Sequence, residues 1–234
     1  MGDTLRIFSG LPPELWEALW LTLRLAFVVM ILLLVVSTPL AYWLSKSKWR
    51  GSVALETLVS LPIVLPPTVI GFYLLMLFSP QRPFGAFWLK LTGQTLTFSF
   101  EGLVIGSVIY SLPYEVQPIL SSFKAVHRDF IDAARTSGAT RLQTFWHVVL
   151  PLSQRGIGVG AILSFAHTLG EFGVVVMLGG SIPGRTKVAS IALYDEVQKL
   201  NYDTAHAYAL ILLLIAFLML LAMTVIQRKI EPAS

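Results

Sequence analysis

Five long apolar stretches alternate with shorter polar segments along the chain. Each stretch holds about 20 or more mostly apolar residues, the length that an α-helix needs to cross the ~30 Å hydrocarbon layer of a membrane. The stretches lie at about 16–44, 57–78, 101–120, 156–178 and 204–226. Because backbone groups in lipid must find their hydrogen-bond partners within the chain, the pattern predicts an all-α integral membrane protein with five transmembrane helices.

The composition agrees with a membrane protein and argues against nucleic acid as a partner. Of 234 residues, 55% are hydrophobic and only 13% are charged, and the mean hydropathy is +0.73, which lies outside the range of ordinary soluble domains. The net charge of +4 does not gather into a basic stripe with interleaved aromatic residues, so no nucleic-acid partner is expected. The chain has no cysteine, which excludes disulfides, thiolate metal sites and cysteine nucleophiles. We therefore expect most of the chain to be surrounded by membrane lipid.

The distribution of lysine and arginine predicts the orientation. Ten of these residues lie in segments that share one side of the predicted topology: 45–56, 121–155 and 227–234. Six lie in the segments of the opposite side: 1–15, 79–100 and 179–203. Basic residues in short loops are retained in the cytoplasm. The N-terminus is therefore predicted outside and the C-terminus inside, which makes 1–15 an external segment and 227–234 a cytoplasmic tail.

The second apolar stretch carries residues that interrupt helices: Pro62, Pro66, Pro67 and Gly71. Each proline removes a backbone donor and clashes with the preceding turn. We therefore expect a kinked or broken helix here, which suits a helix lining a pathway. The alternative is that these residues serve helix packing alone, since proline and glycine are frequent in membrane helices.

The cytoplasmic loop 121–155 is too long and too patterned for a simple connector. Phe130, Ala133 and Ala134 recur with Ser137 at helical spacing, so one face of a short helix is small and apolar. Gly138 is expected to end that helix, and a second one follows it. The segment predicts a helix–turn–helix shelf that can dock closely into another protein. The alternative is an amphipathic loop lying on the membrane surface.

One motif in this loop matches a known pattern. Asp132-Ala133-Ala134 is followed by three residues, Gly138, nine residues, Val148, one residue and Leu150-Pro151. The spacing resembles the EAA loop of ABC-importer permeases, with Asp in place of Glu and Val in place of Ile. The resemblance implies a coupling helix that inserts into a groove on an ATPase subunit. The coupling residues would be Phe130, Asp132, Ala133, Ala134, Gly138, Leu150 and Pro151.

The resemblance has further implications for the whole chain. It implies that residues 16–226 form a type I ABC importer permease domain, and that two copies of the chain form a homodimer. It also implies two copies of a separate ATPase subunit that bind ATP–Mg and hydrolyse it. The chain itself would be a transport subunit and not an enzyme, with no cofactor and no metal of its own.

Two other blocks narrow the family. Leu61–Gly71 and Ser164–Gly173, the latter followed by Ser181-Ile182-Pro183-Gly184, are similar to molybdate permeases. The element Gly170–Gly173 is shared with sulfate permeases. This resemblance implies import of molybdate across the bacterial cytoplasmic (inner) membrane from a periplasmic molybdate-binding protein. Tungstate, sulfate and thiosulfate remain alternative substrates.

His167 and Glu171 are four residues apart and therefore share one helix face. A bare carboxylate in the path of a dianion repels it by roughly 4 kcal/mol per unit charge pair at 4 Å and an effective dielectric near 20. Glu171 is therefore predicted in a gate or a helix–helix lock, with Gly170, Phe172 and Gly173 as its hinge, and not in a substrate site. The alternatives are plain structural pairing and an intramembrane hydrolase that uses His167 and Glu171.

A second pattern, Gly179–Thr186, has the spacing of a phosphate-binding loop with Arg185 in place of lysine. Pro183 deletes one backbone donor of such a loop, and arginine does not replace its lysine. No nucleotide is therefore expected at this loop.

Overall fold

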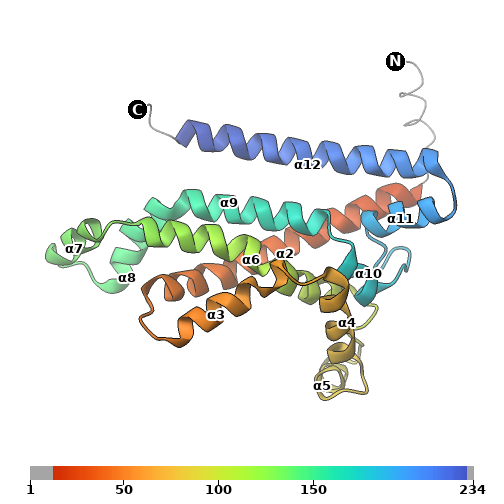
Figure 1. Ribbon diagram of the computed structural model, residues 1–234, viewed down its shortest axis with the longest axis horizontal. Coiled ribbons are helices and arrows are strands. Elements are labelled where there is room, and N and C mark those ends of the chain that lie inside the picture. Colours follow the sequence, from red (N-terminus) through yellow and green to blue (C-terminus); the bar gives the residue numbers. More distant parts are fainter. Residues whose placement is uncertain (1–12, 231–234) are drawn as a thin grey trace.

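The computed structural model describes residues 13–230, and every regular element in that range is helical (Figure 1). The predicted all-α class is confirmed. The elements are α2 (Pro13–Lys46), α3 (Gly51–Ser60), the 3-10 turn η1 (Leu61–Ile63), α4 (Pro67–Phe78), α5 (Pro83–Thr92), α6 (Phe100–Ala125), α7 (Arg128–Thr136), α8 (Arg141–Thr144), the π-helical turn η2 (Phe145–Val149), α9 (Leu150–Leu169), α10 (Gly173–Gly179), α11 (Ala189–Gln198) and α12 (Tyr202–Ile230). The predicted segments 1–15 and 227–234 lie largely outside the described residues.

Four helices in the described range are long and apolar enough to cross a membrane: Pro13–Lys46, Phe100–Ala125, Arg141–Leu169 and Tyr202–Ala222. A fifth span exists if Gly51–Ile63 and Pro67–Phe78 are counted together, although they are bent by 108° at the break between them. This break coincides with the proline block, so the predicted interruption of the second stretch is confirmed.

The fourth apolar stretch differs from the expected continuous span 156–178. Its helix already begins at Arg141 and ends at Leu169, and α10 starts separately at Gly173. Residues 141–155, which the sequence assigns to the cytoplasmic loop, and with them Leu150 and Pro151, therefore belong to this continuous helix. In η2 the Leu150 N–H bonds to the Phe145 carbonyl, five residues back. This wide turn lies directly before Pro151, which has no N–H to donate, so the shelf continues into the span without a stop.

Helices α2, α6 and α9 form the centre of the bundle, and glycines on α9 permit its close approach to α6. A Cβ built on Gly156 would lie 2.3 Å from the Cβ of Ser122, and one on Gly160 would lie 2.9 Å from the Glu115 carbonyl oxygen. Nothing lies within 4 Å of a Cβ on Gly158. Gly156 and Gly160 therefore serve helix packing, whereas Gly158 does not.

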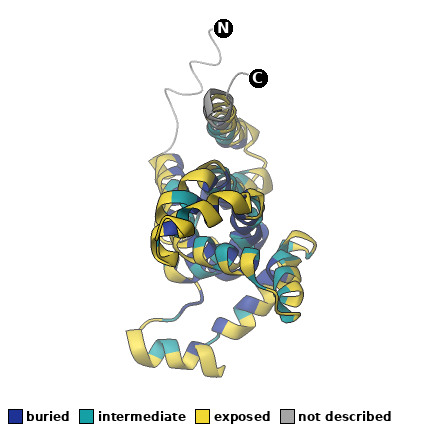
Figure 2. Ribbon diagram, turned by 90° about the vertical axis from the view of Figure 1, so that its left-hand side faces the viewer, coloured by how far each residue is buried: buried dark blue, intermediate teal, exposed yellow. Residues whose placement is uncertain are grey.

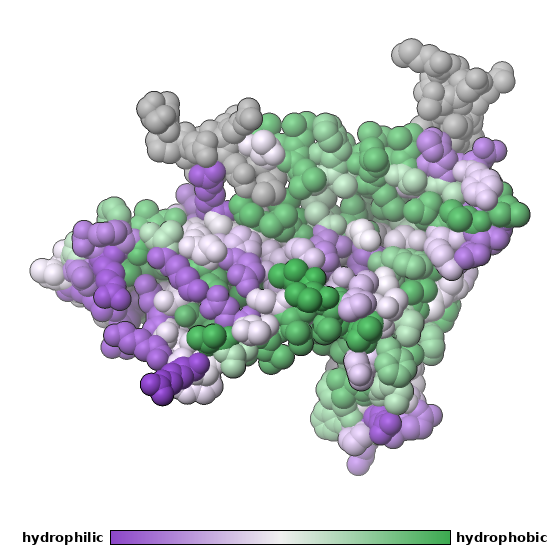
Figure 3. Space-filling model, in the orientation of Figure 1, coloured by the Kyte–Doolittle hydropathy of each residue, from purple (hydrophilic) through white to green (hydrophobic). Residues whose placement is uncertain are grey.

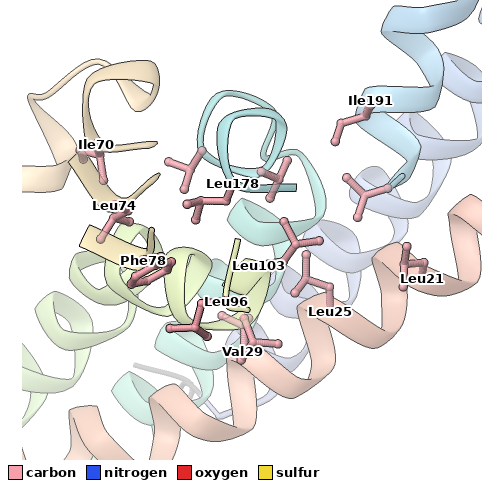
Figure 4. Packing of buried hydrophobic residues seen from close by; sticks show 14 of the residues in the cluster. Leu21, Leu25, Val29, Ile70, Leu74, Phe78, Leu96, Leu103, Leu178 and Ile191 are labelled. Atoms are coloured by element: carbon pink, nitrogen blue, oxygen red, sulfur yellow. The ribbon is translucent and has the colours of Figure 1, made fainter. Parts of the chain in front are cut away.

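Buried apolar side chains connect the bundle to the short helices beside it. Leu25 and Val29 of α2 join Leu103 of α6, Leu74 of α4 and Leu178 of α10 in one cluster (Figure 4). Figure 2 shows the buried residues at the centre of the bundle and α12 at its edge. This cluster fixes α4 and α10 against the three central helices.

The surface is divided in the way a membrane protein requires. Hydrophobic residues cover α12 and part of the middle of the molecule, whereas hydrophilic residues gather at the α7 end and at the tip of α5 (Figure 3). Large exposed apolar side chains on α12 include Leu213, Leu214, Phe217 and Leu218. The α2–α3 turn and α7 lie at the same end, opposite α11 (Figure 1).

Candidate functional site

The proline block and the Gly170–Gly173 block, far apart in sequence, border one cavity of about 510 Å³. We call it the gate cavity. Its lining residues are Pro67, Thr68, Tyr110, Ala166, His167, Gly170, Glu171, Phe172 and Gly173. The four residues predicted as gate or hinge, Gly170–Gly173, all line this cavity. Of the four residues predicted to kink the second span, Pro67 lines it as well.

Contacts between α4 and α10 bring the two blocks together. A Cβ on Gly173 would lie 2.7 Å from the Cβ of Pro67, and a Cβ on Gly71 would lie 2.8 Å from the Cβ of Met177. Real Cβ atoms essentially never approach other atoms so closely. Glycine is therefore the residue that lets these two short helices touch. Pro67 is the first residue of α4, where the missing N–H removes no helical hydrogen bond.

His167 is held by hydroxyl groups and aromatic rings from α6. Its Nδ1 lies 2.9 Å from the Ser111 hydroxyl, which in turn lies 3.0 Å from the Thr168 hydroxyl. The Tyr114 ring stacks on the imidazole at a centroid distance of 3.8 Å, and the Tyr110 ring lies tilted at 4.8 Å. These contacts fix the plane of the imidazole at the edge of the gate cavity.

Glu171 lies in the break between α9 and α10 and is only 5% exposed. Both of its carboxyl oxygens are buried, and the nearby Ser107 hydroxyl of α6, itself buried, is the side chain that can donate a hydrogen bond to them. The Ser190 hydroxyl donates to the Glu171 carbonyl oxygen at 2.6 Å and so ties the break to α11. A buried carboxyl with so few hydrogen-bond donors around it is rare in folded proteins.

His167 and Glu171 share the gate cavity, but no hydrogen bond joins them. No group of three or more His, Asp or Glu side chains that could hold a metal ion occurs among the residues that the structure describes. The pair therefore has no metal-ligand constellation around it in this part of the chain.

Sequence reasoning missed Thr68 and Tyr110 at this cavity. A signal for the α6 side existed, because Ser107, Ser111 and Glu115 recur every four residues within an apolar stretch and thus form a polar stripe. In the structure the Ser164 hydroxyl of α9 donates to Glu115 Oε2 at 2.6 Å. The polar stripe therefore faces α9 along the centre of the bundle.

The predicted shelf consists of α7, the turn at Gly138, α8 and η2. Ile131 is the one buried residue of α7, whereas Phe130 is 57% exposed and Ala133 and Ser137 are exposed. Asp132 is exposed and Ala134 is half-buried. The small apolar face predicted from the sequence is therefore largely exposed, although Phe130 borders a cavity with residues of α6 and α9. Ile131, which the sequence reasoning missed, is the residue that anchors the helix by burial.

The turn of the shelf has the geometry that glycine permits. Gly138 has a φ of +86°, a left-handed conformation in which a Cβ is unfavourable. The next helix begins with a capping box, in which the Thr140 hydroxyl accepts from the Gln143 N–H and the Gln143 side chain accepts from the Thr140 N–H. Leu150 and Pro151 lie further along, inside the continuous helix that enters the span.

The loop before α11 is closed by an ion pair. Lys187 Nζ lies 2.8 Å from Asp195 Oδ2, which also accepts a hydrogen bond from the Ser181 hydroxyl at 2.6 Å. Partial burial opposes ionisation of Asp195, but the hydrogen bonds from Lys187 and Ser181 and the charge of Lys187 outweigh it, so the pKa of Asp195 lies below its usual value. The buried Thr186 hydroxyl donates to the Gly179 carbonyl oxygen at 2.6 Å, so this loop is organised by its own side chains.

Comparison with known proteins identifies relatives over nearly the whole chain. A family model described as "Binding-protein-dependent transport system inner membrane component" matches residues 34–233. The molybdenum transport system permease protein ModB of Azotobacter vinelandii is 46% identical over 206 residues, covering 88% of this chain and 91% of that protein. The sulfate transport system permease protein CysT of Escherichia coli is 32% identical over 217 residues, covering 93% of this chain and 78% of that protein.

The fold also matches a solved structure. A bacterial ABC transporter involved in the import of the acidic polysaccharide alginate superposes with a TM-score of 0.79 at 18% identity, covering 99% of this chain and 84% of that chain. At this identity the similarity establishes the fold, which is that of an ABC importer permease.

Proposed function

Because the chain belongs to the family of binding-protein-dependent transport system inner membrane components, we propose that it is the permease subunit of an ATP-driven importer of molybdate. The assignment of molybdate as the substrate rests on the 46% identity to a molybdenum transport permease over most of both chains. The sulfate permease is related at only 32% identity. Sulfate and thiosulfate are therefore the second candidates, and tungstate is the closest chemical mimic of molybdate.

The energy for transport comes from a separate ATPase subunit in this proposal. Two copies of that subunit bind ATP–Mg, and the shelf docks into a groove on each of them. The exposed Phe130, Ala133 and Ser137 support this role, because they leave one face of α7 largely open to solvent. Residues 16–226 form the permease domain, and the chain carries out no covalent chemistry.

Two copies of the chain form the translocation path at a two-fold axis in this proposal. One copy offers few helices to enclose a polar route, and its gate cavity is open to the surface. A periplasmic binding protein delivers the anion to the outer loops 79–100 and 179–203, with the N-terminus outside and the shelf in the cytoplasm of a bacterial cell. The basic α2–α3 turn lies at the same end of the bundle as α7 (Figure 1), which supports this orientation.

The test uses the permease reconstituted in proteoliposomes with its ATPase subunit and its binding protein. We expect ATP-dependent uptake of radiolabelled molybdate that excess molybdate and tungstate suppress, and that equal concentrations of sulfate or thiosulfate leave nearly unchanged. Competition by sulfate alone would assign the chain to sulfate import. The mass of the purified permease–ATPase complex, measured by light scattering, tests for two permease copies and two ATPase copies.

A further inference from the structure

Three basic side chains come together where the shelf meets the end of α2. Arg128 and Arg135 recur with the buried Ile131 at spacings of three and four residues, so all three lie on one face of α7. Ile131 belongs to the same buried cluster as Leu44 near the end of α2, and this face of α7 therefore turns towards that end. The charges of both arginines are close enough to act on Lys46, the last residue of α2. We call Lys46, Arg128 and Arg135 the basic cluster.

The acidic side chains near the basic cluster do not form ion pairs with it. Lys124 Nζ lies 3.2 Å from Glu56 Oε1, and His127 Nδ1 lies 3.0 Å from Asp129 Oδ2, so both of these acids have other partners. Asp132 lies on α7 between the two arginines, but within the described part of the chain it forms no ion pair. Like charges that converge repel one another. An anion bound among them would offset this repulsion.

The basic cluster lies at the depth of the lipid headgroups. Helix α2 is long and apolar enough to cross a membrane, and it ends at Lys46. The exposed Trp43 and Trp49 flank that end, with their ring centroids 6.3 Å apart. Tryptophan gathers at the interface between membrane and water. The phosphate group of a phospholipid occupies the same depth, so it lies within reach of Lys46.

Helix α2 also offers a surface for acyl chains directly beside the basic cluster. Its exposed apolar residues recur at spacings of three and four and lead along one side of the helix to Lys46: Leu32, Val35, Val36, Pro39 and Trp43. This exposed stripe continues from the middle of the span to its charged end. A phospholipid has the same division into apolar chains and a charged headgroup.

The two faces of α7 separate this surface from the one proposed for the ATPase subunit. The exposed Phe130, Ala133 and Ser137 share one face. At about 100° per residue, Arg128, Ile131 and Arg135 lie on the nearly opposite face. The arginines therefore point towards α2 and the membrane, and an anion bound to them leaves the face for the ATPase subunit free.

We infer that the basic cluster binds the headgroup of one anionic phospholipid, whose phosphate joins Lys46 of α2 to Arg128 and Arg135 of the shelf while its acyl chains lie along the exposed stripe of α2. Arginine suits this ligand, because its planar guanidinium donates two parallel hydrogen bonds to a phosphate. Basic residues directly beside a transmembrane helix attract anionic lipids. The bound lipid would hold the shelf against the end of α2. The inference does not depend on which anion the permease imports.

The test titrates the purified permease–ATPase complex with phosphatidylglycerol and counts bound lipids by native mass spectrometry. Phosphatidylcholine, which has the same phosphate but no net charge, should bind much more weakly. A basic residue near an anionic headgroup contributes about a factor of five to the affinity, so Arg128→Gln and Arg135→Gln should each lower the affinity for phosphatidylglycerol about fivefold. Arg141→Gln is the matched control, because this exposed arginine belongs to α8 of the same shelf, and it should leave the affinity unchanged.

Several outcomes would overturn the inference. Equal losses in Arg128→Gln and Arg141→Gln would show general attraction by charge, and equal affinities for the two lipids would show no selection for an anionic headgroup. Displacement of the lipid by an equal concentration of inorganic phosphate would assign the cluster to a free anion. Loss of the ATPase subunit from the arginine variants with unchanged lipid binding would assign it to that subunit. If these variants fold poorly, Lys46→Gln tests the site from α2, and unchanged affinity there also overturns the inference.

Discussion

Gly173 packs directly against Pro67, so that a Cβ on the glycine would lie 2.7 Å from the Cβ of the proline. This contact joins the broken second span to the break after α9, two features that are about a hundred residues apart in sequence. It also closes one side of the gate cavity, since both residues line it. If this cavity acts as the gate, we expect its opening to change the distance between these two residues.

The first prediction concerns this contact. Gly173→Ala should force α4 and α10 apart and reduce ATP-dependent molybdate uptake severalfold, because backbone and a rigid proline ring surround the site. Gly158→Ala is the control, since nothing lies within 4 Å of a Cβ there. Uptake is compared at equal amounts of assembled complex. Equal uptake by the two variants would show that the contact has no part in gating.

The second prediction concerns the turn of the shelf. Gly138 and Gly93 both have positive φ angles, +86° and +73°, and open space around a built Cβ. Valine at either position therefore meets the same backbone strain, roughly 1–2 kcal/mol. We expect Gly138→Val to abolish most ATP-dependent uptake by weakening the contact with the ATPase subunit that we propose at the shelf, whereas Gly93→Val, in the outer loop 79–100, should leave that contact intact.

The readout for that pair is the ATP hydrolysis that the loaded binding protein stimulates, measured beside uptake. An uncoupled Gly138→Val complex should lose this stimulation and keep the basal hydrolysis of the ATPase subunits. If Gly138→Val transports molybdate as well as the wild type does, the shelf is not the coupling element.

The third prediction concerns the polar pair at the centre of the bundle. Ser164→Ala removes the hydrogen bond to Glu115, a side chain with no exposed surface whose other oxygen has no partner. A buried polar group left unsatisfied costs about 1–3 kcal/mol. We expect Ser164→Ala to lower the thermal stability of the purified permease.

A double-mutant cycle isolates this interaction. Glu115→Leu should make the further change Ser164→Ala nearly neutral, because the carboxyl that needed the hydroxyl is gone. If Ser164→Ala destabilises the protein equally with and without Glu115, its effect comes from packing and not from the hydrogen bond.

The fourth prediction concerns pH and the loop before α11. The folded-state pKa of Asp195 is lowered by its hydrogen bonds to Lys187 and Ser181. A lowered pKa stabilises the folded loop fully above the unfolded value, about 3.9, and this stabilisation is lost as the pH falls through the folded value. Protection of the loop from hydrogen exchange should therefore be constant from neutral pH down to about 4 and decrease below it.

Asp195→Asn is the matched variant for that measurement. At neutral pH it should reduce protection of the loop by less than about 1 kcal/mol, since solvent screens the pair. Below the folded pKa of Asp195, the variant and the wild type should become alike. A constant difference between them at every pH would contradict the assignment to this ion pair.

The sequence predicted those features that single residues determine locally. Prolines 62, 66 and 67 remove backbone donors wherever they stand, so the break of the second span followed from them without tertiary information. The end of the first shelf helix at Gly138 followed in the same way. In the structure the second span bends by 108° at its break, and α7 ends just before Gly138.

Other features depend on contacts between distant segments. Tyr110 and Thr68 belong to the gate cavity only because α4, α6 and α9 converge there, and neither residue has a local signature. The boundary between loop 121–155 and the fourth span was misplaced for a different reason. Pro151 normally interrupts a helix, but the π-helical turn before it absorbs the missing hydrogen bond, and such a turn has no evident pattern in the sequence.

The most direct test of ATP-driven import is accumulation of radiolabelled molybdate in proteoliposomes that hold the permease, its ATPase subunit and its binding protein. We expect the anion to reach an internal concentration above the external one only when hydrolysable ATP is present on the shelf side. Equilibration of molybdate across the membrane without ATP would contradict this account and identify a passive channel.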